Sequence, residues 1–157
     1  MHEFSININK YTFFKGETKQ FQVPNDWTAS RIWARTGCSN QNGRFVCDTG
    51  DCGQWVDCNN GNVPRTGVPP ATLAEFTFAP TQDYYDVSNV DGFNIPVTIE
   101  VVNSNQPGNN GDPNYWCKNP SCKVDINKIC PYEFQKKNSQ GQVVACYTCK
   151  LIKYLIV

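Results

Sequence analysis

Short runs of alternating hydrophobic and polar residues occupy two parts of the chain. In residues 4–36, β-branched and aromatic residues gather in "FSINI", "YTFF", "KQFQVP" and "RIWART", with polar breaks between the runs. The same character returns after residue 71, and the alternation is clear over Phe76–Phe78 and Pro96–Val102. The long amphipathic period of a helical domain is missing, and only a short helix is predicted, around "KVDINKICPYEFQ". The pattern predicts a mainly β protein, an antiparallel β-sandwich.

Polar, turn-rich segments divide the chain into parts. Residues 37–67 are rich in Gly, Asn, Asp and Cys, and "NSNQPGNNGDPN" is a polar connector. We expect a β-sandwich core from residues 1–36 and 68–105, a loop region from 37–67, and a linker plus a Cys-rich second domain from 106–157. The apolar tail "CKLIKYLIV" is expected to dock as a closing strand.

The charge balance and the hydropathy exclude two classes of partner. Lys plus Arg number 14, the same as Asp plus Glu, among 157 residues. A neutral chain gives no reason to expect nucleic acid or an anionic membrane as the main partner. No apolar run approaches the ~20 residues that span a bilayer, and "MHEFSININK" lacks the basic and apolar regions of a signal peptide. We expect no transmembrane segment and no cofactor.

Nine cysteines are the strongest compositional signal. Zinc is one interpretation, because the spacings in "CYTC" and "CKNPSC" are close to those of zinc ligands, although a single histidine, His2, would make the site all-cysteine. Disulfides are favoured over metal, because the first four cysteines never form a CxxC pair. Disulfides imply an oxidising compartment and therefore secretion. The odd count leaves one cysteine over, so we expect a monomer unless that thiol pairs between chains.

The segment from Gly43 to Cys58, "GRFVCDTGDCGQWVDC", resembles the signature of the thaumatin-like proteins, the pathogenesis-related family that includes osmotin. Every defined position of that signature is matched. "SRIWARTGC", "PPATLAEFTF" and "DYYDVSNVDGFNIPV" also occur in the family's order, and "CKNPSCKVDINKICPYEFQ" is similar to the start of the family's second domain. The resemblance implies a thaumatin-like sandwich with disulfide-rich loops and a reduced second domain.

The resemblance also implies a set of disulfides, namely Cys38–Cys47, Cys52–Cys58 and Cys130–Cys146. Family members carry another cysteine near the N-terminus and a final segment that returns to the sandwich. This chain has neither, so we expect a shortened or truncated member. The cysteines left without inherited partners are Cys117, Cys122 and Cys149. A Cys117–Cys122 bridge is conceivable on spacing, and it would leave Cys149 as the odd thiol.

Several residues near the signature have structural interpretations. Trp33 is expected in the core, and Arg35 is expected to brace the sandwich or the Cys38 loop rather than to touch a ligand. Asp48, Asp51 and Asp57 are interpreted as turn-forming, solvated charges rather than metal ligands.

By the same resemblance, the sandwich carries an acidic cleft. Its arginine would be Arg31, its glutamate Glu75, and two of its three aspartates Asp86 and Asp91, whereas the third lies in the segment that this chain lacks. Carboxylates accept hydrogen bonds from sugar hydroxyls, and aromatic faces cover the apolar side of pyranose rings. The aromatic candidates for the walls of the cleft are Tyr85 and Phe93, with Phe76 and Tyr84 beside them.

The resulting hypothesis is a secreted, antifungal defence protein that binds β-1,3-glucan or a related fungal wall carbohydrate. A second hypothesis is a weak endo-β-1,3-glucanase, with Glu75 as the acid and Asp86 or Asp91 as its partner. A third is an inhibitor of glycan-degrading enzymes, and a fourth is a fragment without function. A purely structural interpretation makes Arg31 a counter-ion and "DVSNVDG" a turn.

Overall fold

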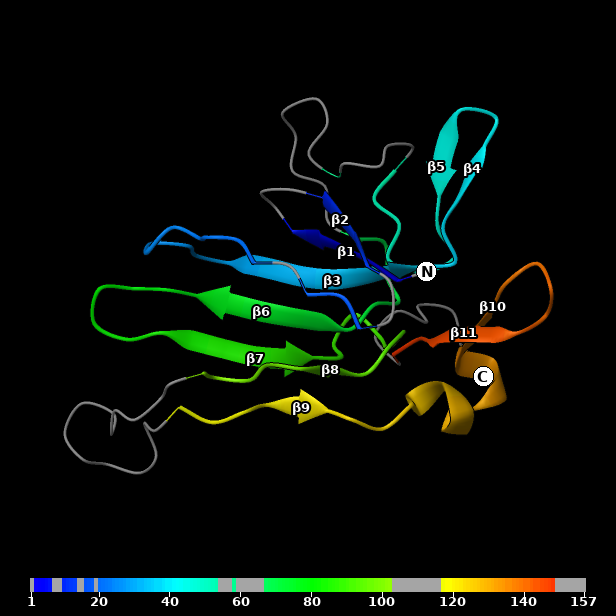
Figure 1. The fold of residues 1–157 in the computed structure, drawn as a ribbon. Coiled ribbons are helices and arrows are strands. Elements are labelled where there is room, and N and C mark those ends of the chain that lie inside the picture. Colours follow the sequence, from blue (N-terminus) through cyan, green and yellow to red (C-terminus); the bar gives the residue numbers. More distant parts are fainter. Residues whose placement is uncertain are drawn as a thin grey trace.

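The computed structural model describes residues 2–6, 10–13, 16–18, 20–53, 58, 67–102 and 117–148, the first two ranges by their backbone alone. Figure 1 shows the elements of these residues. The strands are β1 (His2–Ile6), β2 (Lys10–Phe13), β3 (Ser30–Thr36), β4 (Ser39–Gln41), β5 (Arg44–Val46), β6 (Leu73–Thr77), β7 (Tyr84–Ser88), β8 (Val97–Thr98), β9 (Ser121–Cys122), β10 (Gln135–Lys137) and β11 (Val143–Cys146). Two short 3-10 helices are η2 (Ile126–Ile129) and η3 (Tyr132–Phe134).

Five strands form one antiparallel sheet in the order β2-β1-β3-β6-β7, with β3 at its centre. The β-branched and aromatic residues of "RIWART" favour the extended backbone of β3. Pairing with β6 sets Arg31 opposite Glu75 and Trp33 opposite Leu73. Because successive side chains of a strand point to opposite faces, this register decides which residues share a face.

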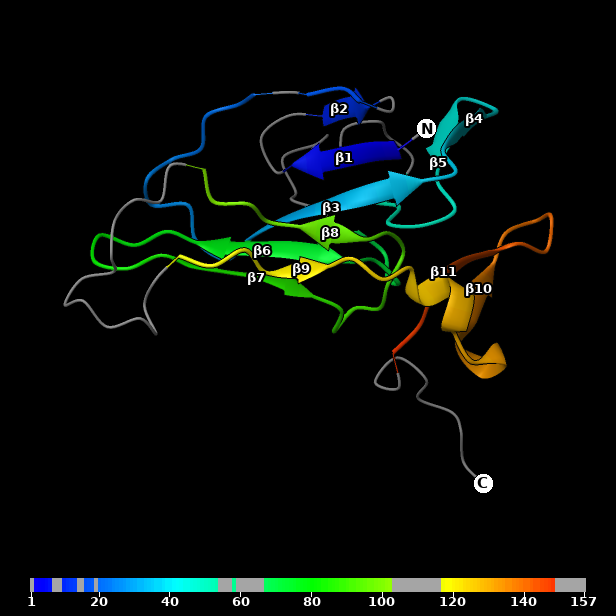
Figure 2. The same cartoon turned by 60° about the horizontal axis from the view of Figure 1, so that its bottom comes forward.

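The two-stranded ribbon of β8 and β9 lies against one face of this sheet, which we call the ribbon face. Figures 1 and 2 show the ribbon beside β6 and β7. The hydroxyl of Tyr85 on β7 donates a 3.0 Å hydrogen bond to the backbone oxygen of Lys118, just before β9. Phe76 of β6 is paired with Tyr85 and therefore points to the same face.

The opposite face, which we call the loop face, is covered at one end by the segment that carries Cys52 and Cys58. Both cysteines pack with Trp33 and Leu73 in one buried cluster. The indole N–H of Trp33 donates a 2.9 Å hydrogen bond to the backbone oxygen of Gly50. Trp33 is only 5% exposed, so its predicted place in the core is confirmed.

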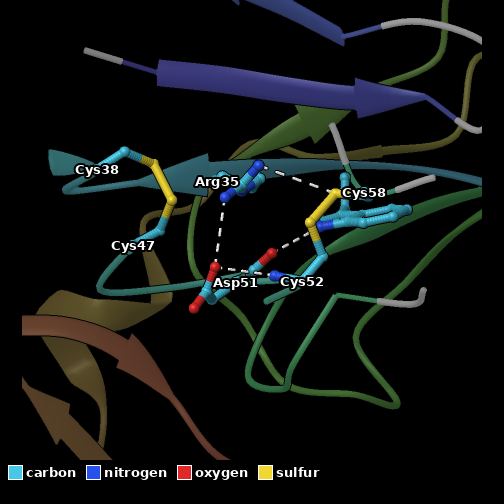
Figure 3. Close-up of polar contacts among 8 residues, drawn as sticks. Arg35, Cys38, Cys47, Asp51, Cys52 and Cys58 are labelled. Carbon is cyan, nitrogen blue, oxygen red and sulfur yellow. Dashed lines mark hydrogen bonds and ion pairs between the residues drawn. A yellow bond between two sulfur atoms is a disulfide. The ribbon is translucent and has the colours of Figure 1, made fainter. Parts of the chain in front are cut away.

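Arg35 joins the same segment to the sheet (Figure 3). Its buried guanidinium lies 3.3 Å from an oxygen of Asp51 and 4.8 Å from the ring centroid of Phe45. The same oxygen of Asp51 accepts the backbone N–H of Cys52 at 2.9 Å. Arg35 is therefore a brace, as the sequence indicates, and Asp51, whose side chain is 27% exposed, is its ion-pair partner as well as a turn residue.

The C-terminal described segment forms a small unit around the Cys130–Cys146 disulfide. Phe93 and Cys146 exchange backbone hydrogen bonds of 2.9 and 2.8 Å, which attach this unit to the chain after β7. The ring of Phe93 packs against both cysteines. On β10, burial lowers the pKa of Lys136, and the negative charges of Asp48 and Asp51 act in the opposite direction.

The mainly β, antiparallel class is confirmed, and the structure forms the disulfides Cys38–Cys47, Cys52–Cys58 and Cys130–Cys146. The short helix expected in the C-terminal part is two 3-10 helices separated by Cys130 and Pro131. Cys117 and Cys122 are both outside any disulfide, so the conceivable Cys117–Cys122 bridge is not formed. Cys149 and the tail that we expected as a closing strand lie outside the described residues, and the domain boundaries stay predictions.

Replacing Gly50 by alanine should destabilise the loop segment strongly. Gly50 has φ +62°, and an added Cβ would collide with the backbone oxygen of Ala34. We expect a loss of about 3 kcal/mol in the free energy of unfolding, from backbone strain and overpacking together. Gly43 is the matched control: its φ is +80°, but no atom lies within 4 Å of the added Cβ. Urea denaturation of both variants measures the difference, and equal losses would contradict the close packing.

Candidate functional site

Three charged side chains lie in a row on the loop face. Arg31 of β3 is directly opposite Glu75 of β6, and Glu75 is directly opposite Asp86 of β7. Adjacent strands are about 4.8 Å apart, so this charged row crosses three strands over roughly 10 Å. Nε of Arg31 lies 3.1 Å from Oε1 of Glu75. The structure thus brings together three of the four charged residues that the sequence predicts for the cleft.

The charged row begins where the covered part of the loop face ends. The side chains of Arg31 and Glu75 are 42% and 31% exposed, and Asp86 is also exposed. Two positions further along the same strands, Trp33 and Leu73 are buried against the cysteine-bearing segment. Regular alternation along β3 and β6 therefore puts a packed end and a solvent-accessible charged end on one face.

One exposed aromatic side chain shares the face of the charged row. Tyr84 precedes Asp86 by two positions on β7, so both point to the loop face, and Tyr84 is 58% exposed. Tyr85 and Phe76 point to the ribbon face instead. Burial and the neighbouring Cys117 thiol raise the pKa of Tyr85, whose hydroxyl is bonded to Lys118. Tyr85 is therefore not positioned to contact a ligand on the charged row, and Tyr84 is.

Phe76 belongs to a separate aromatic group on the ribbon face. Its ring stacks on Trp27 with 5.7 Å between the centroids, and the ring of Phe78 lies 5.9 Å from that of Phe76. Trp27 is only 9% exposed. The group helps to close the end of the sheet and does not wall the site.

Two further predicted site residues lie away from the charged row. Phe93 is 1% exposed, so its ring belongs to the core around the Cys130–Cys146 disulfide rather than to the wall of a cleft. Asp91 follows β7 in the turn that the Gly92 N–H closes onto the backbone oxygen of Asn89 at 3.0 Å. The alternation of β7 ends before this turn, so Asp91 does not continue the row.

The charged row provides hydrogen-bonding groups of both kinds. The carboxylates of Glu75 and Asp86 accept hydrogen bonds, and the guanidinium of Arg31 donates them. Among the residues that the structure describes, no three His, Cys, Asp or Glu side chains are grouped as metal ligands. In the same part of the chain, no helix is long and apolar enough to cross a bilayer.

Reasoning from the sequence does not single out two residues of this region, Tyr84 and Asp51. Tyr84 is only one of several aromatic candidates for the walls of the cleft in the sequence analysis. It lies two positions before Asp86, however, so alternation along a strand would have placed it on the same face as Asp86. Asp51 has no comparable signal, because its partner Arg35 lies 16 residues away and their contact depends on the path of the loop.

Comparison with known proteins agrees with the motifs. The model of the thaumatin family matches residues 4–154. The chain is 47% identical over 130 residues to a glucan endo-1,3-beta-glucosidase of Prunus avium, covering 81% of this chain and 48% of that protein. It is 41% identical over 145 residues to thaumatin-like protein 1a of Malus domestica, covering 90% and 53%. The chain thus spans about half the length of these curated relatives.

Among solved structures, a thaumatin-like xylanase inhibitor is similar to this chain, with 28% sequence identity and a TM-score of 0.44. The match covers 60% of this chain and 64% of the inhibitor.

The two ion pairs made by the arginines of β3 should contribute very differently to the stability of the fold. Arg31 and Glu75 are both partly exposed, so Arg31→Gln should change the free energy of unfolding by less than about 1 kcal/mol. Asp51→Asn should cost more, about 2 kcal/mol, because it removes a negative charge that lies 3.3 Å from the buried guanidinium of Arg35. Urea denaturation checks both, with the exposed Asp26→Asn as a control. A large loss for Arg31→Gln would mean that the charged row serves stability.

Proposed function

The chain belongs to the thaumatin family, and on that premise we propose that it binds β-1,3-glucan or a related fungal wall carbohydrate on the charged row. The observation that carries the proposal is the register that aligns Arg31, Glu75 and Asp86 on one face with an exposed tyrosine beside them. A neutral polymer that is rich in hydroxyls suits this surface. Sugar hydroxyls donate to the carboxylates, and a pyranose face packs on the ring of Tyr84.

The Arg31–Glu75 ion pair is expected to contribute little to the stability of the fold, and this supports a role in binding. Partly exposed ion pairs contribute little to folding, because water screens them and ordering two long side chains costs entropy. The same pair holds the Glu75 carboxylate in one place before a ligand arrives. Such preorganisation lowers the entropy cost of binding. The purely structural interpretation of Arg31 as a counter-ion gives no reason for Asp86 and Tyr84 to accompany it.

The name of one relative supports glucan as the ligand. The Prunus avium protein that is 47% identical to this chain is named for hydrolysis of a 1,3-β-glucan. The matched segment includes about half of that protein, so its whole activity does not carry over to this chain. Three disulfides further support a secreted protein, as a defence role outside the cell would require.

Hydrolysis is the second candidate, and the ion pair between Arg31 and Glu75 argues against it. A glycosidase needs two carboxyl groups that flank the scissile bond, one as acid and the other as base or nucleophile. Glu75 and Asp86 are directly opposite each other on neighbouring strands, with about 5 Å between their Cβ atoms. Glu75 is also engaged with Arg31. We therefore propose binding rather than turnover; inhibition of a glycan-degrading enzyme stays an untested hypothesis.

Substitutions in the charged row should weaken retention on insoluble β-1,3-glucan. Glu75→Gln and Asp86→Asn each replace a charged acceptor by a neutral amide, and we expect about a tenfold loss of affinity for each, corresponding to about 1.4 kcal/mol. Tyr84→Ala should lower the affinity about fivefold through lost ring contact. Co-sedimentation at a series of glucan concentrations measures the dissociation constants.

Matched variants outside the site separate binding from general damage. Glu100→Gln removes an exposed carboxylate after β8, and Tyr132→Ala removes a tyrosine that is 80% exposed in η3. Both should bind like the wild type. If the controls lose as much affinity as the row variants, or if none of the five proteins differs from the wild type, the charged row is not the binding site.

The binding proposal also predicts the absence of turnover. At protein concentrations that saturate binding, the chain should release no reducing ends from soluble β-1,3-glucan, because Glu75, the expected acid, is engaged in the ion pair with Arg31. A colorimetric reducing-end assay over hours is the measurement. Release that disappears in Glu75→Gln and persists in Glu100→Gln would establish the enzyme instead.

A further inference from the structure

We propose that the glucan chain lies across strands β3, β6 and β7, along the charged row, and not parallel to the strands. This inference rests on the proposed function, because it assigns a direction to the ligand of the same site. It also names two adjacent sugar-binding positions. One is between Arg31 and Glu75, and the other is between Glu75 and Asp86.

The first argument is the register. The three charged side chains of the row are the best hydrogen-bonding groups for a sugar on this face. Each of the three neighbouring strands carries one of them, directly opposite the next. Each step from strand to strand is about 4.8 Å, which is close to the length of one pyranose residue. A chain that crosses the strands therefore meets a new charged side chain at each sugar. A chain along β7 meets only one, Asp86, because the next positions on that face are Tyr84 and Ser88.

The second argument is the packing at one end of the loop face. Along β3 and β6, the residues two positions from Arg31 and Glu75 are Trp33 and Leu73, which are 5% exposed each. They are packed under Cys52 and Cys58. A rigid polymer that runs along these strands meets this packed segment after about one sugar residue, since two residues of a strand span only about 6.8 Å.

The third argument is the sheet edge. β7 is the outer strand of the five-stranded sheet, so a chain that crosses it from β6 leaves the sheet directly beyond Asp86. Tyr84 lies next to this exit on the same strand and face. We infer that its ring contacts the flank of the sugar at the second position.

The direction is measurable by NMR on the whole ¹⁵N-labelled chain. The probe is a β-1,3-linked glucose hexamer with a nitroxide at its reducing end, and the unlabelled hexamer is the reference. We expect chemical-shift changes at Arg31, Glu75 and Asp86, and paramagnetic broadening that is graded from strand to strand among these three amides. Within β7, the amides of Tyr84 and Ser88 should be broadened to a similar extent.

The outcomes separate the two proposals. If the unlabelled hexamer causes no shift changes near the row, and co-sedimentation with β-1,3-glucan also fails, the proposed function is overturned. If the hexamer binds but the broadening is graded from Tyr84 to Ser88 and equal across the three strands, the direction is wrong while the function stands. Tyr132→Ala should leave the pattern unchanged, and Asp86→Asn should reduce the shift changes at the β7 end by several-fold.

Discussion

A buried guanidinium needs a carboxylate and further polar or aromatic contacts, because an unpaired charge in the interior costs several kcal/mol. Arg35 finds them in Asp51 and in the ring of Phe45, both brought to the sheet by the segment after β3. The Cys52–Cys58 disulfide lies on the same segment and packs over Trp33. This requirement therefore helps to hold Phe45 of β5 and the residues around Asp51 and Cys52 against one end of the loop face.

Arg31 and Arg35 both lie on β3, four positions apart, so their side chains point to the same face of the sheet. Their roles differ because the cysteine-bearing segment covers one end of β3 and not the other. At the covered end, the ion pair is buried and serves the fold. At the other end, the ion pair is partly exposed and contributes little to stability, so its groups remain available to a ligand. Cover by a single segment thus separates a buried structural arginine from a partly exposed one, for which we propose a role in binding.

Much of this arrangement was predictable from the sequence, and the remainder depended on how segments meet. Alternation gave the strands, and the resemblance gave the disulfides and three members of the charged row. The sequence alone does not show whether Tyr84 or Tyr85 shares a face with the charged row. Side chains alternate between the two faces along a strand, but the face that each one takes is known only once the pairing register is known. Phe93 was misplaced for a different reason. An aromatic residue after a strand looks equally suited to a wall or a core until the position of the Cys130–Cys146 unit is known.

The charged row is complete within residues 31–86, well inside the segment that matches the family. The binding role that we propose uses only these residues. Hydrolysis makes a further demand, because it needs one carboxyl group as an acid and a second as a base or nucleophile at a defined separation. The proposal of binding without turnover therefore rests on the ion pair with Arg31, which engages one of the two carboxylates of the row, Glu75.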